Sequence, residues 1–314
     1  MKENKKYVIG IDGGGSKTAT VLADLQGKIL NRVKTGPSNV NKIGLDQVVN
    51  NISEALNQVS QKYPKNKIAF IYVALAGGIE RDQNKKKEIK NQLLKNQKLT
   101  WLFSKNLLVD SDLLAAFRSG TEQEQGVLLI AGAGSITAGW NKGKEVIVGG
   151  WDYLLGDNGS GFWLGQKALQ VICSSLDGLI PKTLLQDIFF QKLRVKTQGD
   201  LIRKIYQSKE MVKTIASLAP LLNLAAEKGD DLAKNILVAG GDELAIRANL
   251  VIEKLNFKNI KFPLVLAGSV FKSKIILAQV KKRIKKFAPQ VNFIQPKQEP
   301  VIGAVKLAIE HVCL

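Results

Sequence analysis

The chain contains very little cysteine and histidine. Its 314 residues include two cysteines, Cys173 and Cys313, and one histidine, His311. The cysteines form no CxxC pair, which argues against a zinc or iron–sulfur site and fits a reducing compartment. The histidine lies in the predicted last helix, so histidine is a poor candidate for a catalytic base. Thiol and imidazole chemistry are therefore disfavoured.

Long hydrophobic runs are also missing. No apolar run approaches the roughly 20 residues that span a membrane, and Lys2 to Lys6 precede only a short strand-like run, so no secretory signal is visible. Hydrophobic residues make up 45% of the chain and charged residues 23%, as in globular proteins. We expect a cytoplasmic protein of about two domains with no membrane partner.

Acidic residues are scarce, and the formal net charge of +19 invites a nucleic-acid hypothesis. The densest basic run, residues 281–286, belongs to a predicted helix whose apolar residues Leu277, Val280, Ile284 and Phe287 keep helical spacing. No aromatic residues for base stacking alternate with these charges. The pattern favours a solvated helix face, and we expect no nucleic-acid partner.

Glycine, by contrast, is concentrated near the N-terminus. An apolar run ends at Asp12, and Gly13, Gly14 and Gly15 precede Ser16, Lys17 and Thr18. Glycines leave backbone N–H groups free to face an anion in conformations closed to other residues, and Ser, Lys and Thr side chains add donors. The stretch is typical of a phosphate-binding turn, with an ordinary glycine-rich hairpin as the alternative.

The spacing excludes two common nucleotide motifs. A Walker A loop needs Lys directly after its last Gly, and the dinucleotide GxGxxG spacing is missing. Both of those motifs open a helix, whereas residues 18–24 and 28–33 read as strands separated by a turn. The sequence therefore predicts strand, glycine-rich turn, strand, turn, strand.

The same pattern returns later in the chain. A helix with one apolar face over residues 45–59 and a buried strand over 68–75 complete a first α/β unit. A strand over 126–131 then runs into Gly132, Ala133, Gly134 and Ser135, and strand character resumes at residues 136–140. We predict an N-terminal α/β domain over residues 1–110, joined by a C-terminal helix over 300–314. A C-terminal α/β domain with a helical insertion is predicted over 111–299.

Phosphoryl transfer from a nucleotide needs a phosphate site, a metal and a base near the acceptor hydroxyl. Asp12 is the candidate magnesium ligand. Asp112, at a strand end before an apolar helix, is the candidate base, or alternatively a helix N-cap. Asp157, between glycines, is a candidate for binding polyol hydroxyls, or alternatively a turn former.

Seven short motifs occur in one order along the chain. They are DGGGSKT at 12–18, GPSN at 36–39, GAGS at 132–135, GGW at 149–151, GDNGSG at 156–161, LAGS at 266–269 and PVIGA at 300–304. Together they resemble the BadF/BadG/BcrA/BcrD ATPase family, and within it the N-acetylglucosamine and glucosamine kinases.

The resemblance implies an α/β fold with two actin-like ATPase (ribonuclease H-like) domains flanking a nucleotide cleft. It implies ATP and Mg²⁺ as cofactors, the 6-hydroxyl of an amino sugar as acceptor, and a homodimer. Asp112 would be the base, because it heads an Asp-x-x-Ala-Ala segment of the family pattern, with Asp110 close by. Phosphate and nucleotide contacts would come from the turns at 13–18 and 132–135 and from Ala267, Gly268 and Ser269. Sugar contacts would come from Asn39, Gly150, Trp151, Asp157 and Asn158.

Two residues depart from the family pattern. Ala133 stands where many relatives have Thr, and Asn158 where they usually have Glu. The choice among N-acetylglucosamine, glucosamine and N-acetylmuramic acid therefore stays open. A regulatory ATPase or ATP sensor of the same fold is the alternative function. The branch of the family that activates dehydratases through an iron–sulfur cluster is disfavoured, because suitably placed cysteines are lacking.

Overall fold

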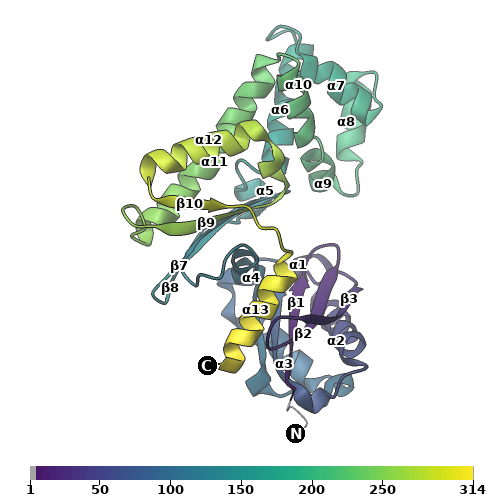
Figure 1. Cartoon of the computed structure of the whole chain (residues 1–314). Coiled ribbons are helices and arrows are strands. Elements are labelled where there is room, and N and C mark those ends of the chain that lie inside the picture. Colours follow the sequence, from purple (N-terminus) through teal and green to yellow (C-terminus); the bar gives the residue numbers. More distant parts are fainter. Residues whose placement is uncertain (1–4, 314) are drawn as a thin grey trace. The chain divides into compact units, whose positions relative to one another are not determined.

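The structure, a computed structural model, describes residues 5–313 (Figure 1). The chain divides into two compact units: unit 1 comprises Met1–Gln123 and Pro296–Leu314, and unit 2 comprises Glu124–Gln295. Asp12 and Asp112 both belong to unit 1, since the first division of the chain falls after residue 123.

Unit 1 is built on a five-stranded sheet in the order β3-β2-β1-β4-β5. Its strands are β1 (Tyr7–Gly13), β2 (Thr18–Asp24), β3 (Ile29–Thr35), β4 (Ile68–Leu75) and β5 (Leu107–Ser111). The first three strands pair antiparallel, whereas β4 pairs parallel with both β1 and β5. Its helices are α1 (Val40–Ile43), α2 (Leu45–Ser60), α3 (Gln83–Lys95), α4 (Asp112–Arg118) and α13 (Pro300–Cys313).

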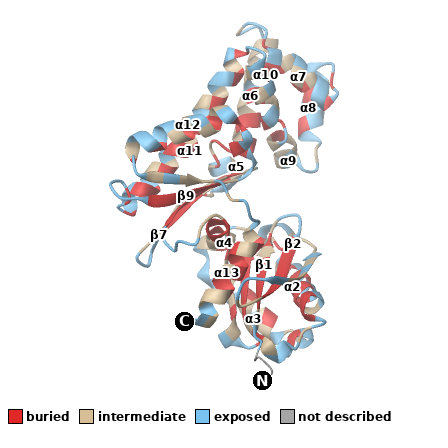
Figure 2. Ribbon diagram, in the orientation of Figure 1, coloured by how far each residue is buried: buried red, intermediate tan, exposed pale blue. Residues whose placement is uncertain are grey.

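Helices cover both faces of this sheet, which explains why β4 is a continuous apolar run. Ile71 and Val73 belong to a core shared with α2, while Phe70 and Tyr72 belong to a second core with α13. The neighbouring strands β1 and β2 are mostly buried (Figure 2). The C-terminal helix α13 packs against β1, β4 and α4, although it lies far from them in sequence (Figure 1).

Unit 2 repeats the strand arrangement of unit 1. Its sheet has the order β10-β9-β6-β7-β8, with β6, β7 and β8 antiparallel and β9 parallel to β6 and β10. The strands are β6 (Gly126–Ala131), β7 (Ser135–Asn141), β8 (Lys144–Gly149), β9 (Phe262–Ala267) and β10 (Val291–Ile294). The repeated pattern of strand and glycine-rich turn predicted from the sequence is therefore confirmed.

Helices make up the rest of unit 2. They are α5 (Asp152–Leu155), α6 (Gly161–Leu176), α7 (Leu184–Leu193), α8 (Gln198–Tyr206), α9 (Met211–Ala216), α10 (Ala219–Glu227), α11 (Asp231–Lys254) and α12 (Lys274–Phe287). One core holds β6, β9, α6, α10, α11 and α12 together. Strand β8 had no sequence prediction of its own; it is half exposed and only one of its residues, Gly149, is buried.

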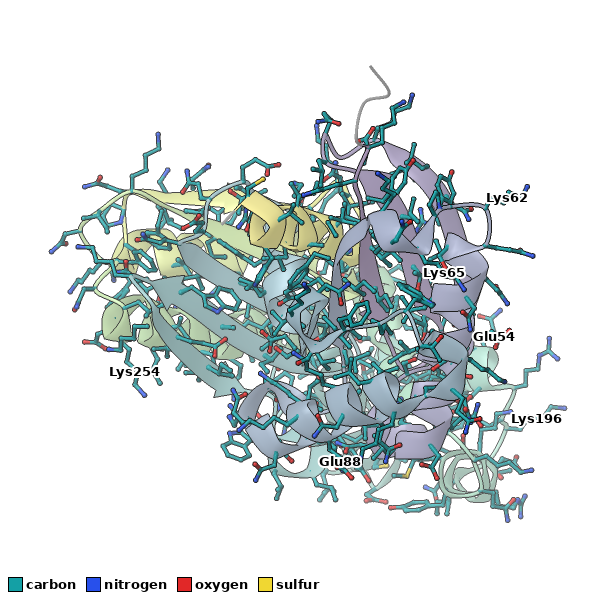
Figure 3. All side chains as sticks on the ribbon, turned by 90° about the horizontal axis from the view of Figure 1, so that it is seen from below. Glu54, Lys62, Lys65, Glu88, Lys196 and Lys254 are labelled. Carbon is teal, nitrogen blue, oxygen red and sulfur yellow. The ribbon has the colours of Figure 1, made fainter. Side chains whose placement is uncertain are left out.

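The basic charges are largely solvated. Helix α12 buries Ile276, Val280 and Ile284 and leaves the cations of the 281–286 run outside the core, which confirms the solvated face predicted for it. Lys62, Lys196 and Lys254 likewise point outward from their units (Figure 3). Within residues 5–313, no helix combines the length and apolar character needed to cross a membrane.

Candidate active site

The glycine-rich turn between β1 and β2 is held in place by backbone hydrogen bonds. The Gly14 N–H donates to the Lys17 carbonyl at 3.0 Å, the Ser38 N–H donates to the Gly14 carbonyl at 2.9 Å, and the Ala76 N–H donates to the Gly13 carbonyl at 2.9 Å. Gly15 and Ser16 are exposed, and no described residue accepts a hydrogen bond from their backbone N–H groups. These N–H groups are therefore available to an anion.

Close packing explains the first glycine of this turn. A Cβ on Gly13 would lie 2.4 Å from Leu75 Cδ2 and 2.9 Å from Ser38 Cβ. None of Gly13, Gly14 and Gly15 has a positive φ. The expectation that these glycines adopt conformations closed to other residues is therefore wrong. At Gly13 the lack of a side chain avoids a clash, whereas a Cβ on Gly14 would make only an ordinary contact, 3.5 Å from the Lys17 carbonyl oxygen.

Thr18 and Lys17 lie in different surroundings. Thr18 is fully buried, its hydroxyl donates to the Gly36 carbonyl at 2.7 Å, and it shares a 2.5 Å hydrogen bond with the Ser38 hydroxyl. Its side chain therefore anchors the 36–38 loop. Lys17 is exposed, and its charge partly opposes the rise in the pKa of Asp12 that burial causes.

A second cation beside this turn was not found from the sequence. The Lys42 Nζ would lie 3.2 Å from a Cβ on Gly15. Lys42 belongs to the short helix α1, and no glycine motif or spacing in the sequence links it to residues 13–15. The loop that follows β3 brings it there, so only the tertiary structure identifies it.

Two carboxyl groups of unit 1 have strongly raised pKa values. Burial raises the pKa of Asp12 to about 6; Lys17 opposes this shift and Glu299 adds to it. Burial also raises the pKa of Asp112 to about 7, with further contributions from the negative charges of Asp12 and Glu80. Carboxylates kept from water and close to one another attract a cation or take up a proton. Glu80, which lies beyond the end of β4, is a contributor that the sequence did not reveal.

Asp110 and Asp112 differ in their contacts. Asp110 accepts hydrogen bonds from Lys86 Nζ at 2.5 Å and from the Tyr72 hydroxyl at 3.4 Å. Among the described residues, no Lys or Arg forms an ion pair with Asp112. The N-cap of α4 is Ser111 and Asp112 is the first helical residue, so the N-cap alternative for Asp112 is wrong. A desolvated carboxyl without a cationic partner, and with a pKa near 7, is suited to act as a general base.

Asn39 offers a polar group to the same unit. Its Oδ1 atom is buried and has no hydrogen-bond partner among the described residues. It sits at the N-cap position of α1 but makes no side-chain capping bond. Gly77, with φ of +120°, approaches it so closely that a Cβ there would lie 3.0 Å from this oxygen. A buried acceptor left unpaired is costly unless a ligand supplies the donor.

In unit 2, the turn after β6 is joined to the loop that carries Asp157. The Gly161 N–H donates to the Gly132 carbonyl at 2.7 Å, and the Ser135 N–H donates to Asp157 Oδ1 at 3.2 Å. Asp157 is only 6% exposed, and its Oδ2 would lie 2.5 Å from a Cβ on Gly134. Burial is the largest cause of its raised pKa. Asp157 also has a φ of +55°, so it serves as a turn former while its Oδ2 remains near the Gly134 turn.

The neighbouring Asn158 belongs to a polar network. Its Nδ2 donates to Glu243 Oε2 at 3.0 Å, and Arg247 Nη1 donates to the same oxygen at 3.0 Å. The Ser135 hydroxyl donates to the Asn158 carbonyl at 3.1 Å. Glu243 and Arg247 of α11 thus place a carboxylate and a cation beside the position where Asn158 departs from the family pattern. No local pattern links these two residues to Asn158.

Gly150 and Trp151 follow β8 in the same unit. Gly150 has a φ of +71°, and its N–H donates to the Ser135 carbonyl at 3.1 Å. Trp151 is 57% exposed. The structure therefore brings Gly150 to the Ser135 turn and leaves most of the Trp151 side chain accessible to solvent.

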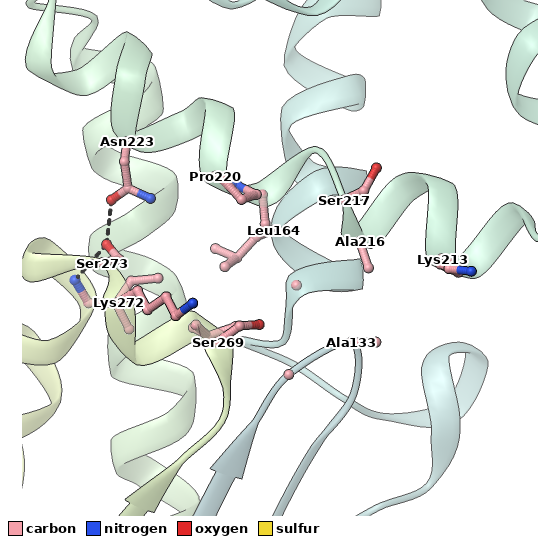
Figure 4. Close-up of a pocket in the computed structure, with 15 residues that line it drawn as sticks. Ala133, Leu164, Lys213, Ala216, Ser217, Pro220, Asn223, Ser269, Lys272 and Ser273 are labelled. Atoms are coloured by element: carbon pink, nitrogen blue, oxygen red, sulfur yellow. Dashed lines mark hydrogen bonds between the residues drawn. The ribbon is translucent and has the colours of Figure 1, made fainter. Parts of the chain in front are cut away.

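A cavity of about 540 Å³ opens beside the Gly132 turn, entirely within unit 2 (Figure 4). Gly132 and Ala133 line it on one side and Ser269, beyond the end of β9, on another. Gly268 has a φ of +105°, and a Cβ there would lie 2.2 Å from the Ala131 carbonyl oxygen, so the two turns approach closely. The remaining lining residues are Gly161, Leu164, Lys213, Ala216, Ser217, Ala219, Pro220, Asn223, Val270, Lys272, Ser273 and Ile276.

Comparison with known proteins gives consistent results across the chain. The sequence model of the BadF/BadG/BcrA/BcrD ATPase family matches residues 9–308. An N-acetylmuramic acid/N-acetylglucosamine kinase of Clostridium acetobutylicum is 34% identical over 96% of this chain and 98% of its own length. An N-acetyl-D-glucosamine kinase of Dictyostelium discoideum is 33% identical over 98% of both chains.

The fold is also shared with solved structures. A Chromobacterium violaceum protein, provisionally named an N-acetylglucosamine kinase, superposes with a TM-score of 0.74 at 22% identity, covering 98% of this chain and 99% of its own. A ROK family glucokinase of Streptomyces griseus gives a TM-score of 0.58 at 15% identity, covering 96% and 98%. The α/β fold predicted from the sequence is therefore confirmed.

Proposed function

Because this chain belongs to the BadF/BadG/BcrA/BcrD ATPase family, we propose that it is an ATP-dependent amino-sugar kinase. The reaction would transfer the γ-phosphoryl group of ATP to the 6-hydroxyl of N-acetylglucosamine or of a close relative. The observation that carries the proposal is Asp112, a desolvated carboxyl with a pKa of about 7 and no cationic partner in the described chain. Two relatives at 33–34% identity over nearly their full lengths bear amino-sugar kinase names, which supports it further.

In the proposed reaction, Asp112 takes the proton of the acceptor hydroxyl as its oxygen bonds to the γ-phosphorus. The bond between the γ-phosphorus and the bridging oxygen breaks, and ADP leaves with that oxygen. The N–H groups of Gly15 and Ser16 and the amines of Lys17 and Lys42 would hold phosphate oxygens, since donors placed where negative charge develops lower the barrier. Asn39 and Asp157 would bind sugar hydroxyls.

The carboxyl groups of unit 1 are compatible with Mg²⁺. No group of three or more His, Cys, Asp or Glu side chains suited to a metal occurs within residues 5–313. Magnesium sites in nucleotide enzymes often use one or two carboxylates, with water and phosphate as the other ligands. Asp12 would supply such a carboxylate, because its desolvation and its proximity to other acids favour a nearby cation. Mg²⁺, when bound, would neutralise phosphate charge.

The cavity of unit 2 would receive the nucleoside of ATP. Gly132 and Ser269 both line this cavity, which supports assigning one turn to phosphate and the other to adenosine. We also propose that the protein forms a homodimer, as the resemblance to the family implies.

Incubation of the pure protein with ATP, Mg²⁺ and a panel of hexoses and amino sugars tests the proposal. We expect ADP release that depends on N-acetylglucosamine, glucosamine or N-acetylmuramic acid. Nuclear magnetic resonance of the product would locate the phosphate on the 6-oxygen. ATP hydrolysis that no sugar changes would instead favour the regulatory ATPase.

The Asp112→Asn variant tests the base directly. Turnover should fall by at least about 100-fold, because general base catalysis contributes that much or more. Nucleotide binding should stay near the wild-type value, because the proposed nucleoside contacts lie in unit 2. Asp110→Asn is the matched control, and a variant at Asp112 that keeps its turnover would remove it as the base.

A further inference from the structure

One amide in the cavity of unit 2 is held in a fixed orientation. Ser273, the N-cap of α12, accepts a hydrogen bond from the Ile276 N–H at 3.3 Å. Its hydroxyl donates to Oδ1 of Asn223 at 2.5 Å, as the dashed line in Figure 4 shows. Asn223 lies on α10 and lines the cavity, so two helices distant in sequence fix this contact.

The contact with Ser273 occupies one end of the Asn223 amide. The Ser273 hydroxyl accepts from the Ile276 N–H and donates its hydrogen to Asn223 Oδ1, so the carbonyl end of the amide is occupied. The Nδ2 group of Asn223, with two N–H donors, then has no acceptor among the described residues. A donor pair is thus left for a ligand in the cavity.

The rest of the lining is also rich in donors. Its charged side chains are Lys213 and Lys272, and no carboxylate is among the lining residues. On the Watson–Crick edge, adenine carries the acceptor N1 beside the N6–H2 donor, whereas guanine carries the O6 acceptor beside its N1–H and N2–H donors, so the two bases differ in sign at the N1 position. A guanine base seated with its N1 at the position of adenine N1 would place its N1–H against the Asn223 donors, and polar groups left unpaired are strongly disfavoured.

We propose that Asn223 selects adenine by donating from Nδ2 to N1 of the base, and that Ser273 is the positioning residue that fixes the amide. The inference rests on the proposed function, in which this cavity receives the nucleoside of ATP. The inference adds to that function the residue that gives the site its specificity for adenine.

Calorimetric titration of the full-length protein with ADP and with GDP tests the proposal without turnover. Wild-type protein should bind ADP more tightly than GDP. Asn223→Ala should weaken ADP by about 5- to 10-fold, the loss of one hydrogen bond. Asn223→Asp replaces the donors by acceptors that suit guanine, so the ratio of GDP to ADP affinity should rise by about 10-fold or more.

Controls separate selection from general damage. Asn235→Ala, an exposed change on α11, should leave both affinities unchanged. Ser273→Thr keeps the cap and the hydroxyl and should keep the ADP preference, whereas Ser273→Ala should reduce it. Thermal unfolding of each variant identifies any that fail to fold.

The possible results point to different conclusions. An ADP-to-GDP ratio that stays at the wild-type value in both Asn223 variants would overturn the inference, even if both nucleotides bind less tightly. Wild-type protein that binds neither nucleotide, or that phosphorylates no sugar, would instead count against the proposed function.

Discussion

Among single residues, Asp112 has the largest functional and energetic consequences. Its pKa of about 7 in the folded protein lies well above the ordinary value of 3.8, and burial is the main cause. The folded state therefore holds this proton at pH values where the unfolded chain has released it. The stability that this gives is complete below about pH 4 and is lost as the pH rises through 7.

We predict that Asp112→Asn stabilises the substrate-free protein at pH 8. The neutral amide removes the cost of a buried charge, which amounts to roughly 2–4 kcal/mol for a shift of this size. Near pH 5 the gain should be smaller, because wild-type Asp112 is then protonated. Urea unfolding at both pH values measures the difference. Equal stability of variant and wild type at pH 8 would show that Asp112 is not desolvated.

A phosphate contact by Lys42 is predicted from the structure alone. Its amine lies beside Gly15, whose N–H group is free among the described residues. Lys42→Ala should lower kcat/KM for ATP by about 10-fold, as expected for one hydrogen bond to a charged group. Lys62→Ala, a change at an exposed lysine of the same unit, is the control (Figure 3). Equal kinetics for the two variants would exclude a phosphate contact by Lys42.

At the level of elements, helix α13 packs against α4 and so fixes its position. Asp112 is the first residue of α4, so its position depends on this packing. Gly303 of α13 packs so closely on α4 that a Cβ would lie 1.9 Å from the Ala115 carbonyl oxygen. Gly10 of β1 makes a similar approach, with a Cβ position 2.5 Å from the Val305 nitrogen. Because backbone atoms cannot move aside as side chains do, glycine is required at both crossings.

We predict that Gly303→Ala lowers the free energy of unfolding by about 2–3 kcal/mol, the usual cost of overpacking. Sugar kinase activity should fall as well, since α4 begins at Asp112 and must shift to admit the methyl group. Gly199→Ala in α8 is the control, because the nearest atom to its Cβ position is 3.8 Å away. Unfolding and turnover measured on both variants decide the matter, and an unperturbed Gly303→Ala protein would contradict the close packing.

For the whole molecule, the notable feature is one strand topology used twice. Both units have three antiparallel strands followed by two parallel ones, with a glycine-rich turn between the first two strands. Each unit also has its own core, and unit 1 completes its core only with residues from the C-terminal end. The two units therefore differ in their dependence on the last helix.

Removal of residues 300–314 should unfold unit 1 and leave unit 2 folded. Without α13, Val8, Val21 and Tyr72 lose the apolar partners that cover them. Hydrogen exchange measured by mass spectrometry should show lost protection in β1 and β4 and retained protection in β6 and β9. Protection retained in all four strands would show that α13 is dispensable for unit 1.

Local patterns in the sequence were sufficient to predict the two glycine-rich turns and the strands beside them, but not strand β8. The predicted strands at 68–75 and 126–131 match the observed boundaries, because apolar runs and turn residues depend on near neighbours. The α/β class followed from the alternation of strand and helix patterns, and the family from the order of seven short motifs. Asp12, Asp112 and Asp157 were singled out for the same reason, since each stands at the end of a strand or between glycines.

The tertiary structure decided what each side chain meets. It tied the Thr18 hydroxyl to Gly36, brought Lys42 to Gly15, and set the negative charges of Asp12 and Glu80 near Asp112. It also joined Ser273 to Asn223 across 50 residues of chain. Such contacts depend on packing between distant segments, which no local pattern encodes, and pKa shifts depend on burial, which exists only once the chain is folded.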